Sequence, residues 1–128
     1  YVDEVTVSTV QELVEAIQSR TKIILKEGTY NFSELDCDSI KNPNIDWIKD
    51  YDGLAEYTVR NVRNLCLEAE EGARVEISTE NSYARALGFE ECQEITLRGL
   101  ICGRSGNIYK LQFYDQRAVQ HVFLHRLL

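Results

Sequence analysis

The sequence predicts an all-β domain built as a parallel solenoid, with one short amphipathic helix near its start. Three observations predict this architecture. Short runs that alternate apolar and polar residues fill the second half of the chain. Similar runs return at spacings of 24 to 30 residues, which is typical of repeat proteins. A stripe of apolar residues at helical spacing lies close to the N-terminus.

The first 32 residues predict a strand at 5–7, a helix over 9–19, a strand over 22–26 and another at 29–32. Thr9 and Glu12 have the spacing of a capping box, in which Thr9 accepts a hydrogen bond from a free helix N–H and Glu12 reaches back. The apolar stripe consists of Val10, Leu13, Val14 and Ile17. We expect this helix to cover the open end of the solenoid, where apolar side chains and strand edges need protection from water.

Residues 33–56 show neither the apolar spacing of a helix nor the alternation of a strand, and they predict an acidic loop insertion. Its aspartates are Asp36, Asp38, Asp46, Asp50 and Asp52. Trp47, Ile48 and Tyr51 predict that part of the loop packs against the domain. The spacing of the aspartates matches no EF-hand, so we expect a solvated loop without a cofactor and keep Ca²⁺ as the alternative.

The repeats are expected in the rest of the chain, at 65–67, 75–77, 87–89, 95–97, 111–113 and 122–124. Residues 64–68 resemble residues 94–98, which lie 30 positions later. The next match to Ile95 is Val122, which lies 27 positions further along the chain. A second series joins Leu87 to Leu111, 24 positions apart. Strands this short, without helices between them, suit stacked parallel coils better than a doubly wound sheet. Chance alternation in another β-rich fold is the alternative.

The segments 10–17 and 22–30, which end in a Gly-Thr-Tyr turn, resemble the N-terminal cap of right-handed parallel β-helix proteins with the pectin lyase-like fold. Residues 42–53, 59–65 and 89–103 resemble bacterial β-helix repeat proteins. The resemblance implies a right-handed parallel β-helix with an N-terminal capping helix and few rungs. It also implies that the chain is the N-terminal portion of a longer β-helix.

We therefore expect one β-helix domain over 1–128, made of the cap and first strands (1–32), the acidic insertion (33–56) and the rungs (57–128). A chain of 128 residues buries roughly two thirds of its unfolded surface, which is enough for one core. The chain contains no Met, so we expect Tyr1 to be an internal position of a longer gene product.

The charge of the chain bears on its partners. Fourteen Lys and Arg stand against 21 Asp and Glu, which gives a net charge of −7. This excludes a general binder of nucleic-acid backbones and disfavours anionic lipid surfaces. No apolar run approaches the roughly 18 residues of a membrane span. We expect no nucleic-acid or membrane partner and favour a secreted or cell-surface location, with the cytoplasm as the alternative.

A sugar-stacking patch is the candidate ligand site. It would combine Tyr109 and Tyr114 with Arg104 and Asp115, because aromatic faces pack on sugar C–H groups. The alternative is that the neighbouring Phe113 faces inward and the tyrosines only flank a rung.

We assign no catalytic residue. The resemblance implies that a polysaccharide lyase would need an Arg or Lys base beside Ca²⁺-binding carboxylates on one outer strand face. The outward positions expected here are Glu76, Thr96, Arg98, Gln112 and Asp115. They form no Asp-rich cluster, so we expect solvated surface residues, with any catalytic rungs beyond this chain.

Metal binding has weak support in the sequence. His121 and His125 would lie about 13 Å apart if residues 118–128 form a strand, but would share a face if they form a helix. No third ligand is identifiable, so we expect ordinary surface histidines. The cysteines, which lack CxxC spacing, predict buried thiols, with a disulfide or metal binding as alternatives. They are Cys37, Cys66, Cys92 and Cys102.

Two functions follow as hypotheses. The first is a carbohydrate-active β-helix protein, a polysaccharide lyase or hydrolase. The second is a non-catalytic surface or interaction module, and the fold alone does not decide between them. An open C-terminal rung would also favour an end-to-end homodimer.

Overall fold

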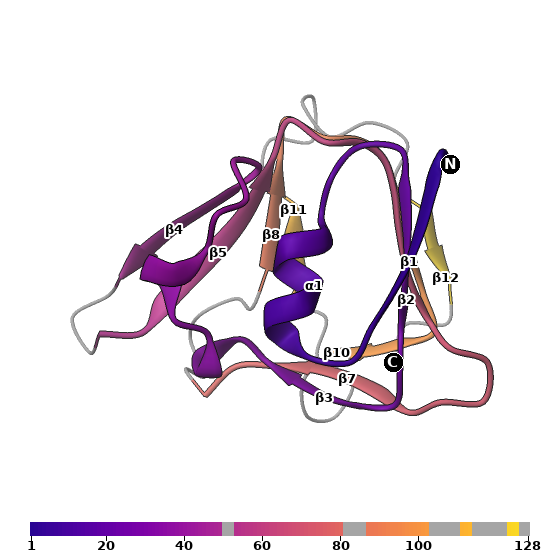
Figure 1. Ribbon diagram of the computed structural model, residues 1–128, viewed down its shortest axis with the longest axis horizontal. Coiled ribbons are helices and arrows are strands. Elements are labelled where there is room, and N and C mark those ends of the chain that lie inside the picture. The colour runs from indigo at the N-terminus through magenta and orange to yellow at the C-terminus, as the bar shows by residue number, and fades with distance from the viewer. Residues whose placement is uncertain (50–52, 81–86, 103–110, 114–122, 126–128) are drawn as a thin grey trace.

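The computed structural model describes residues 1–49, 53–80, 87–102, 111–113 and 123–125, and within them it is an all-β structure with one short α-helix (Figure 1). The elements in chain order are β1 (Asp3–Val7), α1 (Val10–Ala16), β2 (Thr21–Leu25), β3 (Gly28–Asn31), the 3₁₀ turns η1 (Phe32–Glu34) and η2 (Cys37–Ser39), β4 (Ile45–Lys49), β5 (Ala55–Arg60), β6 (Arg63–Ala69), β7 (Val75–Ser78), β8 (Leu87–Glu90), β9 (Gln93–Arg98), β10 (Leu100–Cys102), β11 (Leu111–Phe113) and β12 (Phe123–His125). No helix among these residues has the length and apolar composition needed to cross a membrane.

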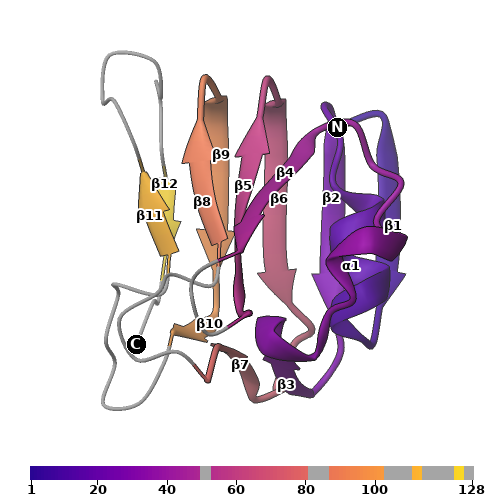
Figure 2. The same cartoon turned by 90° about the vertical axis from the view of Figure 1, so that its left-hand side faces the viewer.

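The strands form three sheets. Sheet A has the order β1-β2-β6-β9-β12, sheet B has β3-β7-β10, and sheet C has β4-β5-β8-β11. From β5 onward the chain visits sheets C, A and B in turn and then repeats that order. The three sheets form three sides around a common interior (Figure 1). One circuit of the chain through the three sheets is called a pass, and Figure 2 shows the strands of successive passes stacked along one direction.

The strand register confirms the spacings predicted from the sequence. Leu65 on β6 pairs with Ile95 on β9, which gives the predicted spacing of 30. Leu87 pairs with Leu111 at a spacing of 24. In sheet A, β9 pairs with β12 in the register of the predicted spacing of 27. All of these pairs are parallel.

The interior consists of apolar side chains stacked from one pass to the next. Ile23, Leu67 and Leu97 occupy one register position on three neighbouring strands, and each is at most 1% exposed. Alternate residues of these strands face out, because successive side chains of a strand point to opposite faces. The buried rings of Phe32, in η1, and Tyr57, on β5, lie against each other, with centroids 5.9 Å apart.

The predicted capping helix is present but shorter than expected. The Thr9 side chain accepts a hydrogen bond from the Glu12 N–H at 3.1 Å, and the Glu12 carboxylate reaches back to the Ser8 N–H at 3.1 Å. The whole predicted stripe is buried. The helix lies beside β1 and β2 at one end of the stack (Figure 2). It ends at Ala16 rather than 19, because Ile17 is already extended toward β2.

The segment 33–56, expected to be an acidic loop, contains η2 and the strand β4. This strand pairs antiparallel with β5 at the edge of sheet C. Trp47 and Ile48 were expected to pack down, and this expectation is wrong: they are 37% and 75% exposed. Ile48 lies on the outer face, in register with Glu56, whereas Trp47 lies on the same face as the buried Tyr57. Trp47 is nevertheless exposed because β4 is the edge strand and has no further neighbour on its other side. Tyr51 lies outside the described residues.

One residue near the start of each of β2, β6 and β9 has the same backbone conformation. Arg20, Asn64 and Glu94, which directly precede register-matched residues of β2, β6 and β9, have φ angles of 59°, 59° and 56°. This left-handed conformation costs non-glycine residues energy, and Asn tolerates it better than Arg or Glu. Stacking therefore fixes this backbone conformation whatever residue occupies it.

The C-terminal elements were expected as strands at 111–113 and 122–124. The first is confirmed as β11, and the second is found one residue later as β12. Residues 118–128 had fitted either a strand or a helix, and their described part, Phe123–His125, is a strand. The remaining residues of that segment lie outside the described part.

Candidate functional site

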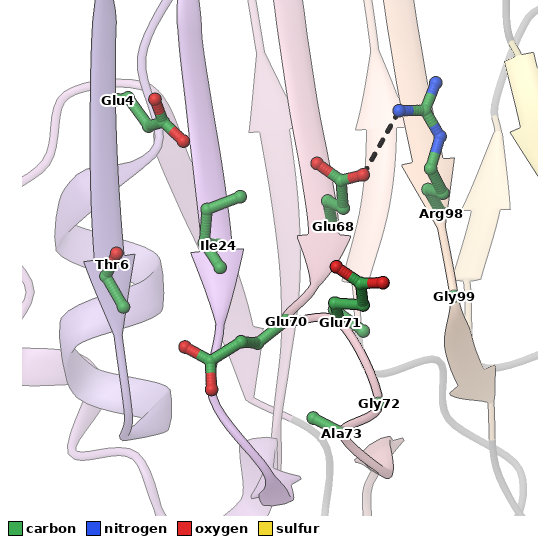
Figure 3. A pocket seen from close by; sticks show the side chains of 11 residues that line it. Glu4, Thr6, Ile24, Glu68, Glu70, Glu71, Gly72, Ala73, Arg98 and Gly99 are labelled. Atoms are coloured by element: carbon green, nitrogen blue, oxygen red, sulfur yellow. Dashed lines mark hydrogen bonds and ion pairs between the residues drawn. The ribbon is translucent and has the colours of Figure 1, made fainter.

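An open groove of about 980 Å³ lies on the outer face of sheet A (Figure 3). Its walls and floor come from β1, β2, β6, β9 and the turn that follows β6. The lining residues are Glu4, Thr6, Ile24, Glu68, Ala69, Glu70, Glu71, Gly72, Ala73, Arg98 and Gly99. The groove thus gathers residues that are far apart in the sequence.

The parallel register places the lining residues in a row. Thr6, Ile24, Glu68 and Arg98 share one register position across β1, β2, β6 and β9. They face outward because their neighbours Val7, Leu25, Leu67 and Leu97 face the interior. His125 on β12 continues the row in the backbone register.

Glu68 is the centre of an ion-pair network. Its two carboxylate oxygens lie 2.9 Å from Lys22 Nζ and 3.2 Å from Arg98 Nη1. Hydrogen bonding from Lys22, followed by that from Arg98, holds the pKa of the Glu68 carboxyl below its usual value. The same contact raises the pKa of the Lys22 amine. Glu68 is therefore ionised and has its acceptors occupied, which makes it unsuited to donate a proton as a general acid.

The turn after β6 projects carboxylates into the groove. It is closed by a hydrogen bond from the Ala73 N–H to the Glu70 carbonyl at 2.9 Å. Gly72 has φ of +79°, which this tight turn requires. Figure 3 shows Glu71 beside Glu68 and Glu70 directed toward the end of β2. Both glutamates are exposed.

Small residues keep the floor of the groove low. Gly99 continues β9 opposite Ala69 of β6, and a Cβ atom at Gly99 would lie 3.2 Å from the Ala69 Cβ. A larger residue at 99 would push these two strand ends apart or fill the groove. The small size of Gly99 and Ala69 therefore sets the depth of the groove.

The ligand residues predicted from the sequence, Arg104, Tyr109, Tyr114 and Asp115, lie outside the described residues. His121 lies outside them as well. The sugar-stacking patch thus stays a prediction.

Three outward positions expected from the sequence have described side chains. Arg98 is exposed and lies in the groove, and Glu76 is half-buried on the outer face of sheet B. Thr96 was expected to be solvated, which is wrong: it is 7% exposed. The Tyr1 side chain lies near it on the outer face of sheet A.

Sequence reasoning named Arg98 as an outward residue but did not single out Glu68 or the other glutamates of the groove. The signal was present, since the spacing of 30 already aligned Glu68 with Arg98. The contribution of Glu4 and Glu70 could not be predicted, because it depends on how the turn after β6 and the first strand are placed.

Cys37, Cys66 and Cys92 are buried free thiols, as predicted, and the side chain of Cys102 lies outside the described part of the structure. Burial raises the pKa of the Cys66 and Cys92 thiols. The described residues contain no group of three His, Cys, Asp or Glu side chains placed to hold a metal ion. Two of the loop aspartates have structural roles: Asp36 caps η2, and Asp46 pairs with Arg60.

Comparison with known proteins gives no relative from which a function could be transferred. No family model matches the chain, and neither a curated protein nor a solved structure matches it.

Proposed function

We propose that the chain is the N-terminal part of a right-handed parallel β-helix of the pectin lyase-like kind, and that the groove on sheet A binds a polysaccharide. The order in which the chain visits the three sheets, with parallel pairing between the strands of successive visits, supports the β-helix. The helix at one end of the stack, whose apolar face is buried, supports it further.

The observation that carries the binding proposal is the open groove across four parallel strands. A groove open along its length can take a chain-like ligand that extends beyond it. Its charged side chains, Arg98 and the glutamates, offer donors and acceptors of the kind that sugar hydroxyls use. Ile24 and the floor of Ala69 and Ala73 offer apolar contact to sugar C–H groups.

For these rungs we propose binding rather than bond cleavage. Abstraction of a sugar proton requires an available base. Arg98 is ion-paired with Glu68, and the hydrogen bonds from Lys22 and Arg98 lower the pKa of Glu68, so neither residue of this pair is suited to act as that base. If the longer protein is a lyase or hydrolase, we propose that its catalytic rungs lie beyond the chain.

Blocking the groove tests the proposal. Ile24→Trp places an indole in the middle of the groove, whereas Thr29→Trp places one on the exposed outer face of sheet B. Affinity for a panel of neutral and charged oligosaccharides is measured by isothermal titration calorimetry. We expect Ile24→Trp to weaken binding by about tenfold or more and Thr29→Trp to leave it unchanged. Equal affinities for both variants, or no binding to any member of the panel, would refute the proposal.

A second candidate function is a non-catalytic interaction module. The exposed Trp47 and Ile48 on the edge strand β4 favour it, because exposed edges and large apolar side chains recruit other chains. Loss of pull-down or self-association in the Ile48→Lys variant would support this function over glycan binding. The end-to-end homodimer stays a prediction, because the side chains of the last pass lie outside the described residues.

A further inference from the structure

We infer that the groove on sheet A selects its polysaccharide by charge, and that affinity falls in the order amino-sugar polymer, neutral polymer, uronic-acid polymer. The inference rests on the proposed function, because it names the substrate class of the same groove.

The charges of the groove lining are unequal. Four carboxylates, from Glu4, Glu68, Glu70 and Glu71, face one guanidinium, from Arg98. Lys22 adds a second cation at the edge of the groove, bound to Glu68. The groove therefore carries more negative than positive charge.

The two cations are already matched by protein carboxylates. Lys22 and Arg98 share Glu68, at 2.9 and 3.2 Å. A sugar carboxylate would have to displace Glu68 from one of them to gain an ion pair. Binding of an acidic sugar therefore exchanges one ion pair for another without a net gain.

The remaining carboxylates are placed to repel anions. Glu70 and Glu71 are exposed on the turn after β6, and neither forms an ion pair with another described residue. Figure 3 shows Glu70 and Glu71 on the same open side of the groove as Glu4 and Glu68. Charges within about 8 Å act on a bound ligand before salt screens them. Uronate groups are repelled there, and the ammonium groups of an amino sugar are attracted.

The experiment compares three oligosaccharides of equal length, built from glucosamine, N-acetylglucosamine and galacturonate. Dissociation constants of the unmodified chain are measured by calorimetry at low and at high salt. We expect glucosamine to bind about tenfold or more tightly than galacturonate at low salt, with N-acetylglucosamine between them. High salt should reduce the differences.

A pair of charge variants assigns the effect to the groove. Glu70→Gln with Glu71→Gln removes two charges beside the ligand, and Glu34→Gln with Glu91→Gln removes two exposed charges elsewhere. We expect the first pair to narrow the glucosamine preference about fivefold or more and the second pair to leave it nearly unchanged.

The possible failures are distinguishable. Galacturonate binding as tightly as N-acetylglucosamine, or equal effects of the two variant pairs, would overturn the charge selection and leave glycan binding intact. Binding to none of the three sugars would overturn the proposed function itself, and the charge selection with it.

Discussion

Leu65 on β6 lies in parallel register with Ile95 on β9, and both side chains are fully buried. This pairing fixes the side of the sheet on which the next residues lie. It brings Glu68 beside Arg98 on the outer face, because each lies three positions further along its strand. The buried pattern of the interior therefore decides which polar residues meet in the groove.

The capping helix should be required for stability. Leu13→Asp with Ile17→Asp places two charges at fully buried positions of the lid. Burying an unpaired charge costs several kcal/mol, so the melting temperature should fall by about 10 °C or more. Gln18→Asp, at an exposed position, is the matched control and should have little effect. A soluble double variant with an unchanged melting temperature would show that the helix is not a lid.

Asn42 should connect the insertion to the helix. Its Nδ2 donates to the carbonyl oxygens of Val14 and Ile17, at 2.8 and 2.6 Å. Asn42→Ala removes both bonds, together with the bond that the Asn44 N–H donates to the Asn42 Oδ1 at 2.9 Å, and should lower the free energy of unfolding by about 1–3 kcal/mol. Asn42→Asp should lower the free energy of unfolding more than Asn42→Ala does, because a carboxylate would face two carbonyl oxygens. Urea unfolding of both variants gives the order, and an Asp variant more stable than the Ala variant would contradict the assignment.

Gly99 should tolerate alanine less well than Gly72 does. Both have positive φ, at +74° and +79°, so alanine costs each position about 1–2 kcal/mol. At Gly99 the new Cβ also meets the Ala69 Cβ at 3.2 Å, whereas nothing lies within 4 Å at Gly72. We expect an additional loss of about 1 kcal/mol at Gly99 in chemical denaturation. Ala69→Gly should relieve that additional loss in a double-mutant cycle, and strictly additive effects would refute the contact.

The conformation shared by Asn64 and Glu94 predicts that two substitutions change the stability of the chain in opposite directions. Glu94→Asn should stabilise the chain by about 0.5–1 kcal/mol, since Asn adopts the left-handed conformation at lower cost. Asn64→Glu, the mirror change one pass earlier, should destabilise it by a similar amount. Thermal unfolding measures both. Shifts of the same sign in the two variants would mean that local backbone strain does not govern this position.

The parts of the fold that repeat could be predicted from the sequence. The period of 30 follows from inward residues such as Leu65 and Ile95, which must be apolar on every pass. The helix was predictable because its cap and stripe are local features of residues 9–17. The strand β4 was not, since it contains Asp46 and Lys49, pairs antiparallel, and leaves Ile48 exposed. Its pairing with β5 is tertiary and has no periodic signal.

The groove was harder to predict than the core. Outward residues have no hydrophobic pattern, so the spacing of 30 that aligns Glu68 with Arg98 is the one sign in the sequence that Glu68 has a partner. The register aligns it with Arg98, but the ion pair with Lys22 lies diagonally across the sheet. Such a diagonal contact follows from the twist and side-chain lengths of the folded sheet.

Glycan binding in the groove on sheet A is tested most directly by locating the bound sugar on the molecule. A ¹⁵N-labelled chain is titrated with the tightest-binding oligosaccharide, and backbone amide shifts are followed by NMR. Glycan binding in the groove should produce saturable shifts at Glu68, Gly72 and Gly99 and leave the amides of Thr29 on sheet B and Thr58 on sheet C unmoved. Saturable shifts confined to sheet B or C, with the groove amides unmoved, would contradict it.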